Sequence, residues 1–371
     1  MKSLLKELGS GVLIGIANII PGVSGGTFLL ILGLFQRVMS AISGLNAEVI
    51  KTMLGHSAGV LFSRERKMHF SALTGLIVKN DLFFLMKIGI GAVAAILVLS
   101  DVMVYLLSNQ FPNTYAFFFG LIVVSTLQSL RLVEKLTAGR IIMLLLGIVL
   151  TIGVTVAVNP ADKAKTKSDH YKEMYERNLS QQEQSAATPA DATKSRFAGV
   201  YTPGDYAVAF VAGALGVSAM VLPGLSGSLV LILIGQYHKV IGAISSLRTF
   251  KPDYFLFLSL FAVGMIVGVL LFSRLVTFVF KRFYNGTIAF LTGLMAGSLY
   301  TLWPFKGIVV MDQYVKGAKG ISVAHDVVVR TNANTLPGST AELIRVLVMC
   351  GAGAAIMIYL SRFKEEQALE Q

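Results

Sequence analysis

Charge is scarce in this sequence, and cysteine is nearly absent. Only 14% of the 371 residues are charged, whereas 54% are hydrophobic. Several apolar runs approach the roughly 20 residues that a helix needs to cross the hydrocarbon core of a bilayer. The single cysteine, Cys350, excludes an internal disulfide. The composition therefore indicates a polytopic membrane protein.

The residues that enzymes and metal sites need are also few. The five histidines are scattered along the chain and lack the spacing of metal ligands. The sequence shows no recognisable pair of a nucleophile and a general base. We therefore expect neither enzymatic activity nor a metal or other cofactor. The formal charge of +12 would suggest nucleic acid in a soluble protein, but membrane topology explains most of it, so we expect no nucleic-acid partner.

Apolar segments come in two groups of four, separated by a polar stretch. The first group covers residues 8–42, 82–108, 114–130 and 141–158, and the second covers residues 206–244, 254–273, 286–303 and 341–361. Residues 159–204 between them are rich in Lys, Glu, Gln, Ala, Asp and Thr. We predict two membrane domains, residues 1–158 and 205–371, joined by an extramembrane loop at 159–204.

One motif occurs in both groups. Residues 21–27 read Pro-Gly-Val-Ser-Gly-Gly-Thr, and residues 223–229 read Pro-Gly-Leu-Ser-Gly-Ser-Leu. With the offset of 202 that aligns the prolines, nine of the twenty-two pairs from Pro21/Pro223 to Ile42/Ile244 are identical. Shared apolar composition alone would rarely align Pro, Gly and Ser together, so the halves are predicted to be structural repeats.

The placement of Lys and Arg predicts how the repeats are oriented. If residues 8–42 dip into the membrane and return to the same side, three crossings follow and the second half is inverted. Fifteen cations then collect on one side, whereas the connection at 108–113 on the other side carries no charge. By the positive-inside rule the first side is cytoplasmic, both termini lie there, and residues 159–204 are outside.

The predicted fold class is an all-α polytopic membrane protein with two inverted-topology repeats. Each repeat is a re-entrant broken-helix hairpin, at 8–42 or 206–244, followed by three transmembrane helices. The alternative is that each of these two apolar runs makes two ordinary crossings or one long tilted crossing.

The chemistry of the motif points to an anion. Pro removes a backbone donor and Gly permits unusual dihedral angles, so the motif reverses the backbone at membrane depth and a new helix begins. The first amides of that helix have no intrahelical partner and carry the positive end of its dipole, which suits phosphate or carboxylate. A kinked helix packed on its neighbours is the alternative. We predict that the two ends meet in a polar chamber with the substrate-binding residues Ser24, Gly25, Gly26, Thr27, Ser226, Gly227 and Ser228.

Four cations are further candidates for substrate binding. Arg37 and Lys239 occupy equivalent places beyond the breaks, where they could guide a phosphate to the chamber or anchor the hairpins at the membrane surface. Arg131 and Arg345 lie near the ends of crossings and are candidate headgroup contacts. Asp101, inside a predicted crossing, is either a proton carrier for coupled transport or an interfacial carboxylate.

These features together resemble a known family. The paired motifs, their sequels Ile-Leu-Gly-Leu-Phe and Ile-Leu-Ile-Gly-Gln-Tyr, and the eight-segment plan are similar to the bacterial polyprenyl-phosphate transporters, the PopT-type undecaprenyl-phosphate translocases, formerly a domain of unknown function. The resemblance spans nearly the whole chain. The charged loops at 45–80 and 159–204 match no pattern of that family.

The resemblance implies a flippase of the bacterial cytoplasmic (inner) membrane. It would return undecaprenyl phosphate from the outer to the inner leaflet, so that cell-envelope and peptidoglycan synthesis can reuse the lipid carrier. Its partners would be the polyprenyl-phosphate substrate and membrane lipids, and a homo-oligomer is possible. A phosphate monoester carries about −1.5 to −2 charges at neutral pH, so its passage through hydrocarbon demands neutralisation by dipoles, hydroxyls or cations.

Two other functions compete with this one. A transporter of a small soluble anion, such as a carboxylate or sulfonate, could use the same helix ends. A lipid-phosphate phosphatase would need an acid–base or nucleophile cluster near the motifs, and the sequence shows none.

Overall fold

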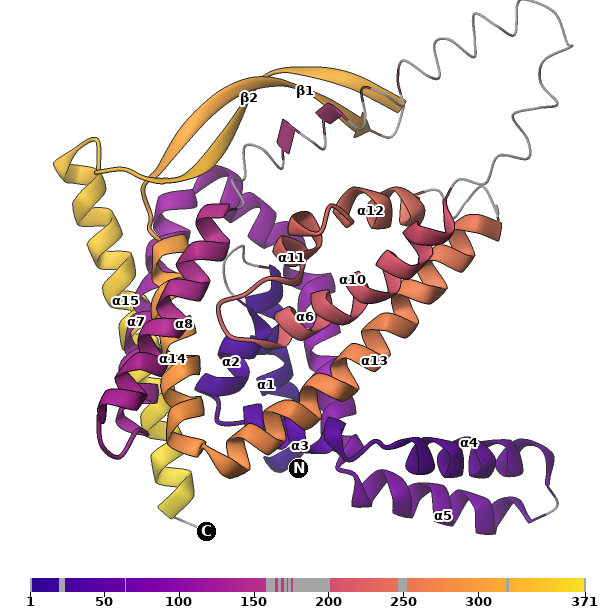
Figure 1. Cartoon of the computed structure of the whole chain (residues 1–371). Helices are drawn as coiled ribbons and strands as arrows, with labels where there is room; N and C mark the ends of the chain where they lie inside the picture. The colour runs from indigo at the N-terminus through magenta and orange to yellow at the C-terminus, as the bar shows by residue number, and fades with distance from the viewer. Residues whose placement is uncertain are drawn as a thin grey trace, which may run out of the picture.

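The computed structural model describes residues 2–19, 24–63, 65–157, 164–165, 168–169, 172, 175, 201–245, 252–317 and 320–369. Most of the predicted loop at 159–204 lies outside these ranges, and so do residues 21–23 of the first motif. Most of the described chain is helical (Figure 1). The helices are α1 (Lys2–Ile19), α2 (Gly25–Ile31), α3 (Phe35–Ser43), α4 (Ala47–Phe62), α5 (Arg66–Lys79), α6 (Leu82–Asn109), α7 (Phe111–Arg131), α8 (Ala138–Ala157), α10 (Pro203–Val221), α11 (Gly227–Leu233), α12 (Tyr237–Ser245), α13 (Pro252–Arg282), α14 (Tyr284–Thr301) and α15 (Thr340–Leu369), and the strands are β1 (Lys306–Gly317) and β2 (Gly320–Asn334).

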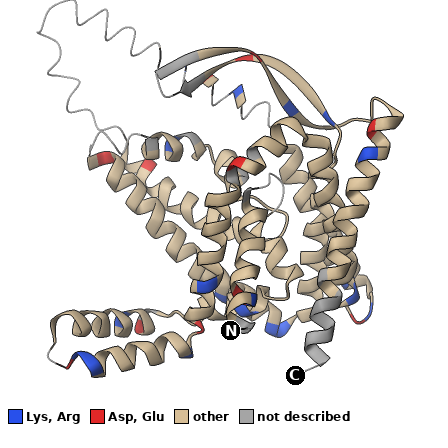
Figure 2. Ribbon diagram, turned by 180° about the vertical axis from the view of Figure 1, so that it is seen from behind, with Lys and Arg blue, Asp and Glu red and all other residues tan. Residues whose placement is uncertain are grey.

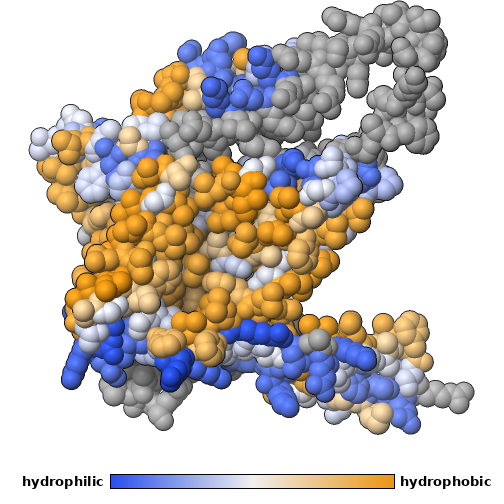
Figure 3. All heavy atoms as spheres, viewed as in Figure 1, coloured by the Kyte–Doolittle hydropathy of each residue, from blue (hydrophilic) through white to orange (hydrophobic). Residues whose placement is uncertain are grey.

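Among the described residues, six helices are long and apolar enough to cross a membrane. They are α6, α7, α8, α10, α13 and α15, and α2 with α3 forms one further apolar pair that is bent by 114°. In Figure 3 a broad band of hydrophobic atoms covers the body of the molecule, with hydrophilic atoms above and below it. A band of this extent needs lipid around it. The prediction of a helical, polytopic membrane protein is confirmed.

Pairs of parallel helices with small residues at their contacts build the body. Gly11 and Gly15 of α1 face Ile88 and Ala92 of α6 in the same order, and a Cβ added at Gly11 would lie 2.3 Å from the Ile88 carbonyl oxygen. The pairs α10 with α13, α7 with α15 and α8 with α14 also have glycines at their contacts. Small residues allow this close approach of helix backbones in a membrane. The last two pairs each join a helix of the first half to one of the second, so both halves share one body.

Elements of the two halves correspond at the offset of the doubled motif. α11 and α12 begin and end 202 residues after α2 and α3. α1 packs along α6, the next long helix after α2 and α3, and α10 packs along α13, the next long helix after α11 and α12. In Figure 1, α1 starts at the lower side, where both chain ends lie, and α10 starts at the upper side.

In each half, a second break divides the helix that the sequence predicts after the motif. The products are α2 and α3 in the first half and α11 and α12 in the second. The chain turns at Gly33, where φ is 67°, and at the equivalent Gly235, where φ is 73°. Glycine adopts positive φ without the penalty that a Cβ brings. The runs predicted as the hairpins 8–42 and 206–244 therefore hold three helices each, α1 to α3 and α10 to α12.

Two hairpins outside the membrane body were not predicted. β1 and β2 form an antiparallel hairpin that arches over the upper side (Figure 1), with Val309 opposite Val329. The charged loop predicted at 45–80 is a helical hairpin, α4 with α5, that projects from the lower side. Neither hairpin contains an apolar run long enough to span a membrane. The sequence-based prediction located helices by such runs and therefore passed over both.

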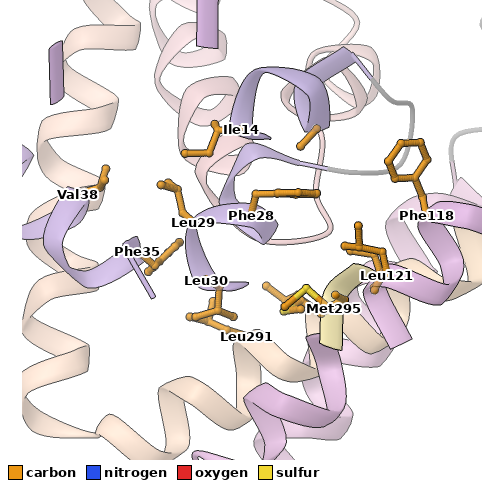
Figure 4. Packing of buried hydrophobic residues seen from close by; sticks show 14 of the residues in the cluster. Ile14, Phe28, Leu29, Leu30, Phe35, Val38, Phe118, Leu121, Leu291 and Met295 are labelled. Carbon is orange, nitrogen blue, oxygen red and sulfur yellow. The ribbon is translucent and has the colours of Figure 1, made fainter. Parts of the chain in front are cut away.

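The hydrophobic core is centred on α2. Phe28, Leu29 and Leu30 are buried and pack against Leu121 of α7 and Met295 of α14 (Figure 4). The helix that follows the first break is therefore enclosed by elements of both halves. Its counterpart α11 is more open, because residues 227, 228 and 230–232 are only half-buried and its last residue, Leu233, is exposed.

Charge is distributed unevenly between the two sides. Figure 2 shows Lys and Arg gathered at the lower ends of the helices, near both termini, and nearly absent from the middle of the helices. The charge-free connection predicted at 108–113 joins α6 to α7 at the upper side. The larger group of Lys and Arg therefore lies on the side of the two termini.

Candidate functional site

The two helix breaks touch each other. Ser24, at the end of the first break, donates from Oγ to the main-chain oxygen of Leu222 at 2.8 Å. Thr27, in the first turn of α2, accepts at Oγ1 from the amide of Gly224 at 3.1 Å. Segments about 200 residues apart are thus joined by two hydrogen bonds, and the structure brings the two halves of the predicted site together.

Glycine makes this contact possible. A Cβ added at Gly26 would lie 1.9 Å from the carbonyl oxygen of Val221, so any side chain there would push the two breaks apart. Gly224 has a φ of 78° and also lies close to α14, where an added Cβ would be 2.5 Å from the Leu294 oxygen. The glycines of the motif therefore provide close approach of main chain to main chain.

Two amides at the start of α2, those of Gly25 and Thr27, already donate to protein groups. Ser24 caps the helix, accepting at Oγ from the amide of Thr27 at 3.3 Å, and Asn18 of α1 accepts from the amide of Gly25 at 3.0 Å. Ser24 and Thr27 are 4% and 1% exposed. The first half of the site is therefore a closed and internally bonded floor.

The start of α11 is different. The side chain of Ser226, the residue before the helix, makes no bond to the main chain of α11 and instead lies 2.9 Å from the hydroxyl of Ser228. No described residue accepts a hydrogen bond from the amides of Gly227 or Ser228. Both serines are only half-buried. One of the two hydroxyls donates to the other, and the second hydroxyl and the two amides have no acceptor among the described residues.

No carboxylate of the described residues bonds to the four hydroxyl side chains of the site, which are Ser24, Thr27, Ser226 and Ser228. Their partners are one another and the main chain. A site made of hydroxyls, amides and a helix start, with no competing negative charge, favours an anion.

The predicted cations Arg37 and Lys239 lie away from the meeting point, each in an ion pair. Arg37 binds both carboxylate oxygens of Asp81, at 2.6 and 2.8 Å, reaches Glu7 at 3.3 Å and stacks over the ring of Phe84 at 3.7 Å. The carboxylates neutralise its charge at the lower side, as expected of a residue that anchors the hairpin at the surface.

Lys239 has an analogous place at the upper side. Its ammonium lies 2.5 Å from Asp205, and the main-chain oxygen of Lys239 accepts from Tyr201 at 3.5 Å. Tyr201 stacks on Phe257 with ring centres 4.2 Å apart, and burial raises the pKa of Tyr201 to about 12. The phenol therefore stays neutral beside the ion pair.

Arg131 and Arg345 are not part of the meeting point. Arg131 is the exposed last residue of α7, and Arg345 is exposed near the start of α15, where its Nε donates to the Ala341 oxygen at 3.4 Å. These two positions are near opposite ends of the molecule, since α7 ends at the lower side and α15 starts at the upper side (Figure 1). Asp101 is exposed on α6, and no described residue forms an ion pair with it.

Three polar residues that bond to predicted site residues were missed in the sequence. Asn18 caps Gly25, Glu7 pairs with both Arg37 and Lys87, and Asp205 holds Lys239. A polar side chain inside an apolar run close to a helix break was the available signal for Asn18. The histidines are also less scattered than the sequence suggested, because the Nδ1 atoms of His56 and His69 lie 3.1 Å apart.

Comparison with known proteins places the chain in a family. A family model described as VCA0040-like, undecaprenyl phosphate translocase-like, matches residues 14–319, which include both motifs. The chain belongs to this family. A polyprenyl-phosphate transporter of Vibrio cholerae is 28% identical over 356 residues, covering 96% of each chain. A polyprenyl-phosphate transporter of Staphylococcus aureus is 27% identical over 297 residues, covering 79% of this chain and 84% of the relative. No solved structure matches the chain.

Proposed function

We propose that this protein is a flippase for polyprenyl phosphate, with the phosphate bound where the two helix breaks meet. Two relatives named polyprenyl-phosphate transporters cover at least 79% of the chain, and the site offers hydroxyl and amide donors without a carboxylate. The observation that carries the proposal is the direct contact between the breaks, because it creates one site from both halves.

The two halves of the site have different roles in this proposal. Ser226, Gly227 and Ser228 donate to the phosphate oxygens, since their hydroxyls and amides are not bonded to the main chain of α11. Ser24 and Thr27, with Gly25 and Gly26, form the floor that holds the second break in place. Lys239 and Arg37 bind a headgroup only if it displaces the carboxylates with which they pair. Arg131 and Arg345 contact headgroups at the two surfaces of the membrane.

The topology we propose is that of inverted repeats. Support comes from the shift of 202 residues between equivalent helices and from the opposite starting sides of α1 and α10. Because Lys and Arg gather at the lower side, that side is cytoplasmic and contains both termini. The protein would act in the bacterial cytoplasmic membrane, returning the lipid from the outer to the inner leaflet for reuse in cell-envelope synthesis.

The packing of α3 and α12 supports an outward-facing state. At the lower side α3 closes against α13 of the other half, with Phe35 and Phe280 ring centres 5.8 Å apart and the hydroxyls of Ser43 and Thr277 at 3.4 Å. At the upper side the buried residues of α12 cluster with Phe257 and other residues of their own half. At the lower side α3 thus contacts the other half, whereas at the upper side α12 packs on its own half.

Transport in proteoliposomes tests the proposal. Purified protein is reconstituted with a polyprenyl phosphate that carries a fluorescent group, and a membrane-impermeant quencher reports the fraction in the outer leaflet over time. We expect the protein to accelerate the exchange of lipid between leaflets. Equal rates with and without protein would contradict the proposal. The alternative, a transporter of soluble anions, is tested with saturating inorganic phosphate or acetate. It predicts that the proteoliposomes take up these ions instead of exchanging lipid between leaflets.

Paired serine variants localise the site. Ser226→Ala with Ser228→Ala removes two hydroxyls that bond only to each other among the described residues, and it orphans no main-chain group. Transport should therefore fall by an order of magnitude or more while the protein stays folded. The matched control is Ser125→Ala, a buried serine that bonds only to the Leu121 oxygen of its own helix. Unchanged transport in the double variant would exclude these hydroxyls as ligands.

A further inference from the structure

A helical hairpin with exposed apolar side chains projects from the lower side of the body. α4 and α5 leave the chain between α3 and α6 and run across the direction of the membrane-spanning helices (Figure 1). The root of the hairpin is fixed, because Asp81, whose φ of 55° turns the chain into α6, is held by Arg37. In the second half only residues 246–251 join α12 to α13, so the hairpin is specific to the first half.

The hairpin has no hydrophobic core of its own. None of the residues of α5 is buried. The two helices meet where His56 lies against His69, an approach that Gly59 permits because an added Cβ there would be 2.5 Å from the His69 ring. Leu61 of α4 is 65% exposed and Phe62 is 87% exposed. Apolar surface of this kind requires something to cover it.

The apolar residues share one face of α4. Leu54, Ala58 and Leu61 have the spacing that places side chains on one side of a helix, and all three are exposed. In Figure 3 the hydrophobic atoms of the hairpin lie mainly toward the apolar band of the body, and hydrophilic atoms cover much of the side away from it. The face therefore continues the lower edge of the band that lipid surrounds.

Charge identifies what covers this face. Residues 46–80 contain two acidic side chains, Glu48 and Glu65, against the five cations Lys51, Arg64, Arg66, Lys67 and Lys79. An apolar face flanked by Lys and Arg is typical of helices that lie in the headgroup layer of membranes containing anionic lipids. Coverage by a second copy of this chain would bring two positively charged hairpins together, which opposes such a contact.

We propose that the α4–α5 hairpin lies in the headgroup layer of the leaflet on the side of the termini and binds anionic phospholipids. Leu54, Leu61 and Phe62 enter the boundary of the acyl chains, and the cations contact phosphate headgroups. The hairpin thereby fixes the depth of Asp81 and Arg37 in the membrane, next to the bent pair α2–α3. This inference does not depend on which substrate the protein transports.

Spin labels at two positions test the proposal in the full-length protein. Cys350, the single cysteine, is replaced in a Cys350→Ala background, and a label is attached either at Leu61→Cys or at Ser71→Cys. Ser71 is the matched control because it is exposed on α5, one turn from Lys67. The protein is placed in nanodiscs of phosphatidylethanolamine and phosphatidylglycerol, and collisions with oxygen and with a water-soluble nickel chelate are measured.

We expect the label at residue 61 to favour oxygen several-fold over the nickel chelate, and the label at residue 71 to show the reverse. Equal access of nickel to both positions would overturn the proposal. Dipolar broadening at residue 61 that depends on the number of copies per nanodisc would overturn it in favour of a dimer contact.

A charge variant tests the lipid preference separately. Replacing Lys51, Arg66, Lys67 and Lys79 with Gln should raise nickel access at residue 61, and replacing phosphatidylglycerol with phosphatidylcholine should do the same in the unchanged hairpin. If neither change moves the label, anionic lipid is not what the hairpin binds. Size-exclusion chromatography and the transport rate verify that each labelled variant is folded.

Discussion

The amide of Gly224 donates to the hydroxyl oxygen of Thr27 at 3.1 Å, across 197 residues of sequence. The bond is buried, and it joins the second helix break to the first turn of the helix that follows the first break. With the bond from Ser24 to Leu222, it makes the two halves of the site a single unit. A change in the relative position of the halves must therefore break or exchange these bonds.

Replacing Thr27 with Val should destabilise the protein. Val has nearly the same shape as Thr but no acceptor, so the buried amide of Gly224 would lose its partner, at a cost of about 1–3 kcal/mol. Denaturant unfolding of the purified protein in detergent measures this change in the free energy of unfolding. The matched control is Thr126→Val, because Thr126 donates to the Ile122 oxygen within its own helix and its loss orphans no donor. Equal effects of the two changes would contradict a special role for the bond between the breaks.

Replacing Gly26 with Ala should abolish transport and lower stability. The new Cβ would lie 1.9 Å from the main-chain oxygen of Val221, which cannot move without shifting the break. Overpacking of this kind costs about 1–3 kcal/mol or more. Gly153→Ala is the control, since nothing lies within 4 Å of an added Cβ at that position in α8. Transport rates and thermal unfolding should be near normal in the control and reduced in Gly26→Ala.

The sequence was most informative where the chain repeats itself. Pro, Gly and Ser recur in register in the two motifs, so a meeting of the two halves near these motifs could be predicted before the structure was known. The further turns at Gly33 and Gly235 were visible as aligned glycines, but an aligned glycine by itself does not distinguish a positive φ from close packing.

Other features depend on contacts that a sequence does not display. The amide of Gly25 donates to the side chain of Asn18 only because the end of α1 packs against the start of α2, and this packing cannot be read from the sequence. Residues 306–334 form a β-hairpin with several β-branched side chains, yet a search for long apolar runs passes over such a segment. The difference between a closed first half-site and an open second one is partly visible in the sequence, because Gly26 and Thr27 of the first motif are replaced by Ser228 and Leu229 in the second. Which of these residues meets the other half depends on tertiary contacts.

Variants of Arg37 and Lys239 distinguish surface anchors from ligands of the substrate. Arg37 and its partner Asp81 have side chains 46% and 40% exposed, so their ion pair should contribute at most about 1 kcal/mol to folding. If Arg37 is an anchor, Asp81→Asn should affect transport as much as Arg37→Gln does. If Arg37 binds the phosphate, Arg37→Gln should slow transport while Asp81→Asn leaves the cation available and does not. The same comparison applies to Lys239→Gln with Asp205→Asn at the upper side.

Stability should rise between pH 8 and pH 10.5 because of Lys306. This residue, at the start of β1, donates to the Tyr300 oxygen at 3.0 Å, and burial lowers the pKa of Lys306 from 10.5 to about 8. Between these two values the folded protein has lost the proton and the unfolded chain still binds it, so raising the pH favours the folded state. The melting temperature of the unchanged protein, measured relative to Lys306→Met, should therefore increase across this window, because Met removes the titration and keeps most of the side-chain volume. Melting curves of the two proteins that run parallel from pH 8 to pH 10.5 would show that the Lys306 ammonium is not desolvated at the base of the β-hairpin.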